Sequence, residues 1–461
     1  MPGAPKTQLH LADLHRIAAE YDVPKFRMMS RERLVAAIEE AGGDAAVSPE
    51  IEPVAAAAGD AGEGSSSRSA GARRRRRRRE TTPEEEGVDV DGTLEGESGE
   101  PVAETDAAGT RSDDEATEEI SGTLEVLPQR YGFIRVGEIG TDDADVYISA
   151  AQIRRCELRS GDEVAGPARS ARRGERHRAL VHVDRVNGQE PGTSARPSFD
   201  SLPAILPERR LALDGERSAV LTRTMDVFSP LWLGQRVLIS AAARSGRTTL
   251  LRGIARAVSA AEGTELVVLL VDEAPEEATA WREAIDAAEF AVAPADASPA
   301  EQLRTATVAL ERARRAAETG ADVVLICDSL SRLAAAAGEW APVKRLFGSG
   351  RKLAGGGSLT VIATVLDEID AESSAERAVT STESSLVVLD PDLAAAGVYP
   401  ALRIADCQIS NEEQLRSAEE LEAVRKLRAE LATLEPAEAA RIVRERIEAT
   451  ATNAEFFAAI G

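Results

Sequence analysis

The ten-residue segment Ser240–Thr249 constrains the fold of this chain more than any other part of its sequence. It follows a short apolar run, Val237–Ile239, and precedes the start of a helical pattern at Leu250. A glycine-containing loop between a buried strand and a helix is the setting in which backbone amides hold phosphate groups. The segment therefore predicts either a phosphate-binding loop or an ordinary strand-to-helix turn, and its surroundings favour one of the two.

The pattern of residues 200–461 favours the phosphate-binding loop. Apolar runs alternate with alanine-rich stretches of helical length, which predicts a doubly wound α/β domain with a parallel sheet. The whole chain is 43% hydrophobic but only 3% aromatic, which suits a core of Ala, Val, Leu and Ile. Charged helices are expected to close the domain after Glu412. The expected strands are Val237–Ile239, Leu266–Val271, Val323–Cys327, Leu359–Thr364 and Leu386–Leu389.

Two acidic residues follow expected strands of this sheet. Asp328 directly follows the run Val323–Cys327, and Glu273 lies just beyond Leu266–Val271. Because open α/β sheets bind ligands at the carboxyl ends of their strands, we expect both carboxylates near the loop. Asp328 would hold Mg²⁺ through a water, with Thr248 as its partner, and Glu273 would orient or deprotonate an attacking water. The alternative for each carboxylate is a helix N-cap or a first-turn charge.

Residues 119–190 carry a different pattern, in which five short alternating segments are separated by turn residues. This pattern predicts a small five-stranded barrel of the oligonucleotide-binding kind. Tyr131 and Phe133 alternate along one segment and share a face, with Arg135 beyond them. Exposed rings on a barrel stack unpaired bases, although a barrel core would use the same alternation.

The local charge favours the hypothesis that these aromatic residues bind nucleic acid. Eight arginines stand against four acidic residues between positions 151 and 180, in a chain whose net charge is −24. Such a patch predicts attraction to a phosphate backbone. His177 is a candidate for stacking beside the rings, or else an ordinary surface residue.

The N-terminal part is predicted to contain a helical module and a linker. Residues 6–43 show helical periodicity and end at two glycines. Residues 44–118 contain hardly any large apolar side chains, which predicts a disordered charged linker. Within it, the seven consecutive arginines Arg73–Arg79 are either a solvated spacer or a non-specific nucleic-acid tether.

The location of the chain is predicted from its cysteines and its apolar runs. The three cysteines are widely spaced, which is typical of reduced thiols in a cytoplasm. The longest apolar run, Leu266–Val271, is too short to cross a bilayer, and the N-terminus lacks a signal-peptide pattern. We therefore expect a soluble cytoplasmic protein with no membrane partner.

Taken together, the ordered segments resemble the family of bacterial transcription termination factor Rho, whose members are ring-forming hexameric RNA translocases. The resemblance implies a helical N-terminal extension, a cold-shock-like barrel that binds single-stranded RNA, and a RecA-like domain that binds ATP with Mg²⁺. The motifs that carry it, in the family order, are Gly132–Arg135, Asp145–Arg155, Gly174–Arg176, Gly234–Arg236, Asp272–Glu277, Asp328–Leu333 and Gly356–Thr364.

The resemblance also assigns roles to single residues, with Tyr399 packing on the adenine base. The implied RNA-binding positions are Tyr131, Phe133, Arg135, Tyr147, Glu175 and His177, the last standing where an aromatic residue is usual. The implied nucleotide-binding positions are Gly234, Gln235, Arg236, Arg244, Ser245, Gly246, Arg247, Thr248, Thr249 and Tyr399.

Four positions depart from the family pattern, and each departure removes or displaces a cation near the transferring phosphoryl group. The guanidinium of Arg247 is longer and more planar than the lysine ammonium that it replaces. Because an arginine finger contributes about 10³–10⁵ in turnover in other nucleotide hydrolases, we expect hydrolysis to be weak or lost. The four departures are Arg247 for the loop lysine, Ala274 for the arginine after Glu273, Gly397 for a nucleotide-sensing arginine and Ser410 for the arginine finger.

The expected RNA loops of the ring channel also depart from the family pattern. The segment 333–345 looks shorter than the family pattern, and the second loop reads Asp370–Glu376, with three acidic residues. A channel lined in this way would repel RNA phosphates.

Three functions are therefore weighed. The first is a Rho-like termination factor that binds nascent RNA and ATP, with residual hydrolysis helped by Arg244, Lys344 or Arg351. The second is a non-hydrolysing RNA-binding paralogue that regulates termination or co-assembles with an active Rho. The third is a nucleotide-sensing scaffold without RNA. The expected partners are single-stranded RNA, other subunits in a homo-hexamer or a mixed ring with another Rho, and RNA polymerase.

Overall fold

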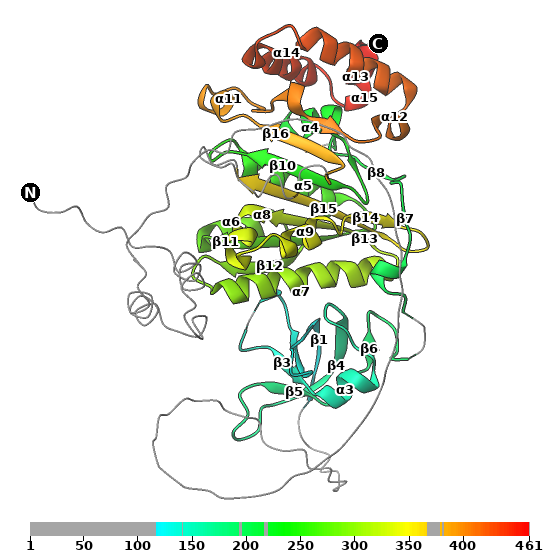
Figure 1. Cartoon of the computed structure of the whole chain (residues 1–461), viewed down its shortest axis with the longest axis vertical. Coiled ribbons are helices and arrows are strands. Elements are labelled where there is room, and N and C mark those ends of the chain that lie inside the picture. Colours follow the sequence, from blue (N-terminus) through cyan, green and yellow to red (C-terminus); the bar gives the residue numbers. More distant parts are fainter. Residues whose placement is uncertain are drawn as a thin grey trace, which may run out of the picture. The chain divides into compact units, whose positions relative to one another are not determined.

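The computed structural model describes residues 117–140, 142–192, 196–215, 220–366, 379 and 382–460 (Figure 1). All of them belong to one compact unit, Thr105–Gly461. Four expectations concern residues outside this described part: the helical module at 6–43, nearly all of the linker at 44–118, its Arg73–Arg79 run, and the second RNA loop at Asp370–Glu376.

The first domain is a small β-barrel, as the alternating segments predict. Its strands follow the order β1-β2-β3-β5-β4, and β1 pairs a second time with β4, which closes the barrel. A two-residue strand, β6 (Arg185–Val186), adds to β4, and helix α3 (Ala150–Arg155) follows β3. The five barrel strands are β1 (Thr117–Val126), β2 (Gly132–Arg135), β3 (Val146–Ile148), β4 (Glu163–Arg169) and β5 (Arg178–Leu180).

The second domain contains the expected parallel sheet. Its strands run in the order β12-β11-β13-β15-β10-β16, and every pair among these six is parallel. Strand β12 is not foreseen from the sequence, because only Phe290 and Val292 within it are large and apolar. The strands are β10 (Arg236–Ala241), β11 (Thr264–Glu273), β12 (Glu289–Pro294), β13 (Asp322–Asp328), β15 (Ser358–Leu366) and β16 (Ser385–Leu389).

Short strands extend this sheet at its margins. Strand β17 (Gln408–Ile409) pairs antiparallel with β16, and β14 (Arg351–Leu353) pairs antiparallel with β15 and with β7 (Ala204–Ile205). Strands β8 (Arg210–Leu211) and β9 (Leu231–Trp232) form a separate pair.

Helices cover both faces of the parallel sheet, so its strands are buried on both sides. Ile239 of β10 belongs to one apolar cluster with Ile254 of helix α5, whereas Leu238 belongs to a second cluster with Ala313 of helix α7. Successive side chains of a strand point to opposite faces, which separates the two clusters. The helices around the sheet are α5 (Arg247–Ala260), α6 (Pro275–Ala284), α7 (Pro299–Glu318), α8 (Leu330–Ala337), α9 (Ala341–Phe347) and α11 (Pro391–Ala395).

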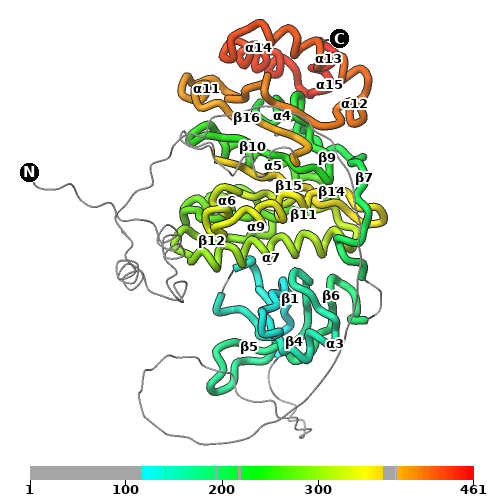
Figure 2. Tube along the Cα trace, in the orientation of Figure 1, coloured from blue at the N-terminus to red at the C-terminus, as the bar shows by residue number. Residues whose placement is uncertain are grey.

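The C-terminal helices pack against a helix that lies more than 200 positions earlier in the sequence (Figure 2). Phe228 of α4 shares an apolar cluster with Val443 and Phe456. The buried Arg223 of α4 donates hydrogen bonds to the carbonyl oxygens of Ile447 (2.9 Å) and Thr450 (2.7 Å). These helices are α4 (Val220–Phe228), α12 (Glu412–Leu415), α13 (Ala418–Leu431), α14 (Pro436–Glu448) and α15 (Asn453–Ile460). No helix in the described part of the chain is both long enough and apolar enough to span a bilayer.

Candidate nucleotide site and aromatic face of the barrel

The loop at 242–246 joins the carboxyl end of β10 to the first turn of α5, as expected of a phosphate-binding loop. Gly246 is the N-cap of α5 with φ of 90°, a left-handed conformation that a glycine adopts without steric cost. Arg244 is exposed and has φ of 63°. The Ser245 hydroxyl donates to the carbonyl of Ala242 at 2.8 Å and closes the turn. The geometry presents the free backbone amides of a helix start, which attract anions.

Thr248 and Thr249 occupy the first turn of α5. Thr248 is half-buried, and Thr249 is exposed. Arg247, the first residue of the helix, turns inward, since only 15% of its side chain is exposed and its Nε lies 3.3 Å from Oδ1 of Asp328. Within the described residues this Nε–H has no hydrogen-bond partner of good geometry, so the contact with Asp328 is electrostatic.

Asp328 lies at the end of β13 and is 1% exposed. The Thr364 hydroxyl donates to its Oδ1 at 2.9 Å. The N-cap of α8 is the next residue, Ser329, whose hydroxyl accepts from the Arg332 amide at 3.3 Å. Ser329, and not Asp328, therefore provides the N-cap of α8, and Asp328 faces the start of α5.

Oδ1 of Asp328, arranged in this way, does not fit direct coordination of a Mg²⁺ ion. Thr248 and Asp328 are the residues that the phosphate-loop and strand-end pattern predicts for that ion. One Asp328 oxygen already accepts from Thr364 and lies against the guanidinium of Arg247. Two cations held against the same buried carboxylate repel each other strongly, because the interior screens charge poorly. Among the described residues no cluster of three His, Cys, Asp or Glu side chains offers another metal site.

Glu273, the second expected catalytic carboxylate, is also paired with an arginine. It ends β11 and is 8% exposed. Its Oε2 accepts a hydrogen bond of 2.5 Å from a terminal nitrogen of Arg332. Ala274, which follows it, is the N-cap of α6 and is exposed. The sheet edge thus brings together Arg247, Asp328 and Thr364, and beside them it holds a second arginine–carboxylate pair.

Three of the expected nucleotide-binding residues lie at the other end of β10. The amide of Gly234 donates to the Thr360 hydroxyl at 2.8 Å, and Gln235 accepts from the Trp232 amide at 2.9 Å. Arg236 donates to the Gly350 carbonyl at 2.8 Å. The structure does not bring these three residues to the phosphate loop, and their polar groups connect the start of β10 to its neighbours.

Three further predicted residues lie beyond β16. Tyr399 is 52% exposed in the loop after α11, and Gly397 in the same loop has φ of 70°. Ser410 is exposed, and its amide donates to the carbonyl of Ser384 at 2.8 Å.

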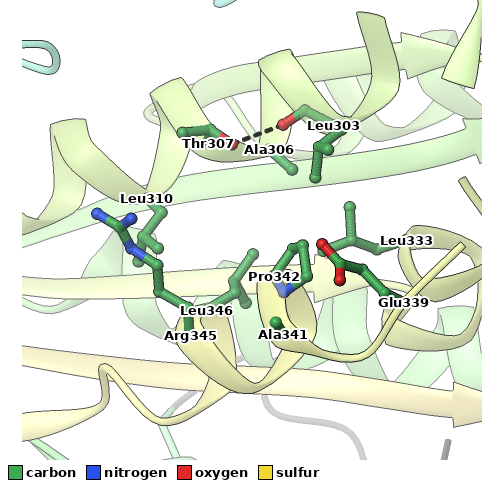
Figure 3. A pocket seen from close by; sticks show the side chains of 10 residues that line it. All are labelled: Leu303, Ala306, Thr307, Leu310, Leu333, Glu339, Ala341, Pro342, Arg345 and Leu346. Carbon is green, nitrogen blue, oxygen red and sulfur yellow. Dashed lines mark hydrogen bonds between the residues drawn. The ribbon is translucent and has the colours of Figure 1, made fainter. Parts of the chain in front are cut away.

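The expected channel segment 333–345 contains the end of α8, a turn at Gly338 and the start of α9. Together with α7 it borders a cavity of about 290 Å³ (Figure 3). The residues that line the cavity are mostly apolar, with Glu339 and Arg345 among them, and include none of the predicted nucleotide-binding or RNA-binding residues. Arg345 donates to a carboxylate oxygen of Glu311 at 2.7 Å.

In the barrel, four rings gather on one face: Tyr131, Phe133, Tyr147 and His177. Phe133 and Tyr147 are direct cross-strand partners in β2 and β3. The ring centroid of Tyr131 lies 6.0 Å from that of Phe133 and 5.7 Å from that of Tyr147. The centroid of Phe133 lies 6.2 Å from that of Tyr147 and 5.0 Å from that of His177. All four side chains are half-buried and lie outside the barrel core, which contains Leu124, Ile134, Val146 and Ile148. The core alternative for the aromatic residues is therefore excluded, because the alternation places Ile134 inside and Phe133 outside.

Arg135, expected beside these rings, is only 4% exposed. Its Nε donates to Oε2 of Glu125 at 3.0 Å, and a terminal nitrogen also contacts Asp145. Burial raises the pKa of Asp145 above its ordinary value, although hydrogen bonds and the Arg135 charge oppose the rise. The guanidinium carbon lies 5.5 Å from the Phe133 ring centroid. Arg135 thus lies beside Phe133, a candidate RNA-binding residue, and is itself held by two buried carboxylates.

Glu175 lies in the basic loop between β4 and β5. Arg169 donates to its two oxygens at 2.6 and 2.8 Å, and the Arg172 amide donates at 2.9 Å. These hydrogen bonds lower the pKa of Glu175 to about 2. The carboxylate orders the arginine-rich loop beside the aromatic face.

The sequence reasoning missed two of the polar partners at the sheet edge. Thr364 ends an expected strand and Arg332 lies in the motif Asp328–Leu333, so both positions carried a signal. Their partners became visible only when the strand order placed β13 between β11 and β15.

Comparison with known proteins identifies both domains. Residues 120–192 match the family described as Rho termination factor, RNA-binding domain, and residues 222–345 match the ATP synthase alpha/beta family, nucleotide-binding domain. The transcription termination factor Rho of Rhodopirellula baltica is 34% identical over 368 residues, which cover 74% of this chain and 71% of that protein. The Rho of Aquifex aeolicus is 33% identical over 367 residues, with coverage of 74% and 84%.

A solved ATPase from the type III secretion system of pathogenic bacteria is also similar, with a TM-score of 0.46 and 22% identity. The match covers 56% of this chain and 79% of that one.

Proposed function

Because the chain belongs to the family of transcription termination factor Rho, we propose that it is a termination factor with weak or lost ATP hydrolysis. It binds single-stranded RNA through the barrel and ATP through the α/β domain. The observation that carries the RNA-binding part is the aromatic face of Tyr131, Phe133, Tyr147 and His177, which the barrel core does not use.

The chemistry of this face suits an unpaired strand. Stacking of a base on an aromatic side chain contributes about 1–3 kcal/mol, and every base has a face to stack. The loop that bears Glu175 adds exposed arginines, among them Arg173 and Arg176. Rings supported by basic residues hold a flexible strand through its bases and its phosphates together.

The nucleotide site supports binding more than hydrolysis. The loop at 242–246 offers a helix start for phosphate, and Tyr399 has an exposed ring for a base. Both carboxylates expected to act in hydrolysis are engaged by arginines of the same chain, Arg247 and Arg332. Hydrolysis needs cations placed on the transferring phosphoryl group, and Ala274, Gly397 and Ser410 provide none.

RNA binding is tested by fluorescence anisotropy of a labelled pyrimidine-rich oligonucleotide with the full chain. Phe133→Ala should weaken binding about 5- to 150-fold, which corresponds to the loss of one stacked base. The matched control is Val181→Ala, which trims a barrel side chain that is 48% exposed outside the aromatic face. Equal affinity of the wild type and Phe133→Ala for the oligonucleotide would contradict the proposal.

Hydrolysis is tested by phosphate release with and without the same oligonucleotide. Turnover should stay near background in both conditions. A clear rise on adding RNA would show that the remaining cations suffice, and the weak-hydrolysis part of the proposal would be wrong.

A second candidate is a non-hydrolysing subunit that joins a ring with an active Rho. The exposed Ser410 favours it, since in rings the active sites are shared between neighbours and a subunit without a finger silences the adjacent site. Titration of this chain into an active Rho should then lower its ATPase rate below the value expected from competition for RNA alone.

A further inference from the structure

We infer that Arg247 takes the place of the metal ion in this site, so that the chain binds nucleotide equally well with and without Mg²⁺. The inference deepens the nucleotide binding proposed above and rests on it. It follows from the contact between Arg247 and Asp328 at the edge of the sheet.

The first step concerns the buried carboxylate. Asp328 is 1% exposed, and the transfer of an ionised carboxylate from water to such a place is costly unless a positive partner compensates it. The Thr364 hydroxyl provides a hydrogen bond but no charge. The guanidinium of Arg247, with Nε 3.3 Å from Oδ1, provides the charge. The carboxylate is thus compensated by the protein itself before any ligand arrives.

The second step concerns the shape of the guanidinium. A lysine ammonium is a single point of charge, so a lysine directed at phosphate leaves the carboxylate to a metal ion. A guanidinium has five N–H donors spread over three nitrogens. With Nε held 3.3 Å from Oδ1 of Asp328, the two terminal nitrogens remain to bind phosphate oxygens as a pair. One side chain then bridges the carboxylate and the phosphate, as a metal ion would.

The third step concerns position. Arg247 is the first residue of α5, and its N-cap Gly246 leaves the backbone amides of the first turn open to an anion. No side chain projects from Gly246, and an added Cβ there would meet no atom within 4 Å. The phosphate would therefore lie between the helix start and the guanidinium. A Mg²⁺ ion that approached Oδ1 of Asp328 would meet the guanidinium of Arg247 there.

The test measures the affinity of the full chain for a fluorescent ADP in excess MgCl₂ and in excess EDTA. The dissociation constant of the wild type should differ less than about twofold between the two conditions. In Arg247→Lys the shorter ammonium frees Asp328 for the metal, and removal of Mg²⁺ should weaken binding about tenfold or more. Arg252→Lys is the matched control on the same helix, because Arg252 pairs with Glu277 and not with Asp328.

The outcomes separate this inference from the proposed function. Wild-type affinity that falls tenfold in EDTA would overturn the role of Arg247 and leave nucleotide binding intact. Absence of binding in both conditions would overturn nucleotide binding and this inference together. A thermal-shift measurement of each variant with ADP, in EDTA and in MgCl₂, provides a second readout and shows whether Arg247→Lys is folded.

Discussion

The substitution Arg135→Ala distinguishes a residue that contacts RNA from one that holds the barrel together. The resemblance to the family places Arg135 among the RNA-binding positions, whereas the structure buries it between Glu125 and Asp145. The side chains of these two acids are 6% and 1% exposed. Removal of the guanidinium leaves the buried Asp145 carboxylate without its positive partner and leaves Glu125 with Arg304, whose Nε lies 3.4 Å from Oε1. Loss of one partner of a buried ion pair costs about 3–5 kcal/mol.

Hydrogen exchange of the barrel amides is the appropriate assay, because it reports this domain separately from the α/β domain. Protection factors of β1 to β3 should fall about 100-fold or more in Arg135→Ala. The control is Arg178→Ala, which removes an ion pair to Glu118 whose partners are 27% and 74% exposed. An exposed pair contributes about 0–1 kcal/mol, so protection should change little.

The pH dependence of the defect provides an independent check. Burial raises the pKa of Asp145 in the folded chain above the ordinary 3.8, so the folded state binds this proton more tightly than the unfolded state. Barrel stability therefore falls as pH rises from 3.8 through the raised pKa. Loss of the Arg135 charge raises that pKa further, so the defect should be largest at neutral pH and shrink in acid. Unchanged protection together with weakened RNA binding would refute the reasoning and assign Arg135 to RNA contact.

Two further predictions follow from single residues. The carboxyl group of Glu175 should titrate in an NMR experiment near a pKa of about 2, so its stabilising hydrogen bonds persist at pH 4 and are lost only as pH falls through 2. A midpoint near the ordinary 4.5 would contradict the hydrogen bonds that Arg169 and Arg172 donate to Glu175. Gly234→Ala should destabilise the chain in urea denaturation by about 1–3 kcal/mol more than Gly355→Ala. Both positions have positive φ, but only at Gly234 would a Cβ meet backbone, 2.6 Å from the Lys352 nitrogen; equal losses would remove the steric explanation.

Local periodicity was enough to predict the barrel and the parallel sheet. Alternation along Tyr131–Arg135 indicates a strand that is buried on one face, and a continuous apolar run such as Val323–Cys327 indicates a strand that is buried on both faces. Both patterns are formed by residues that are neighbours in the sequence. The same reasoning placed Asp328 at the carboxyl end of its strand, near the phosphate loop. The short strand β12 escaped it, because Glu289–Pro294 has too few large apolar residues to stand out from a loop.

Tertiary structure alone decided which charges meet. Arg247 reaches Asp328 because β15 lies between β10 and β13, an order that no local pattern encodes. The same holds for Arg332 with Glu273, and for Arg135, whose burial depends on acids ten residues away on either side. The electrostatic interaction energy of two charges depends on their distance and on how much water surrounds them. Only the folded chain sets that distance and excludes that water.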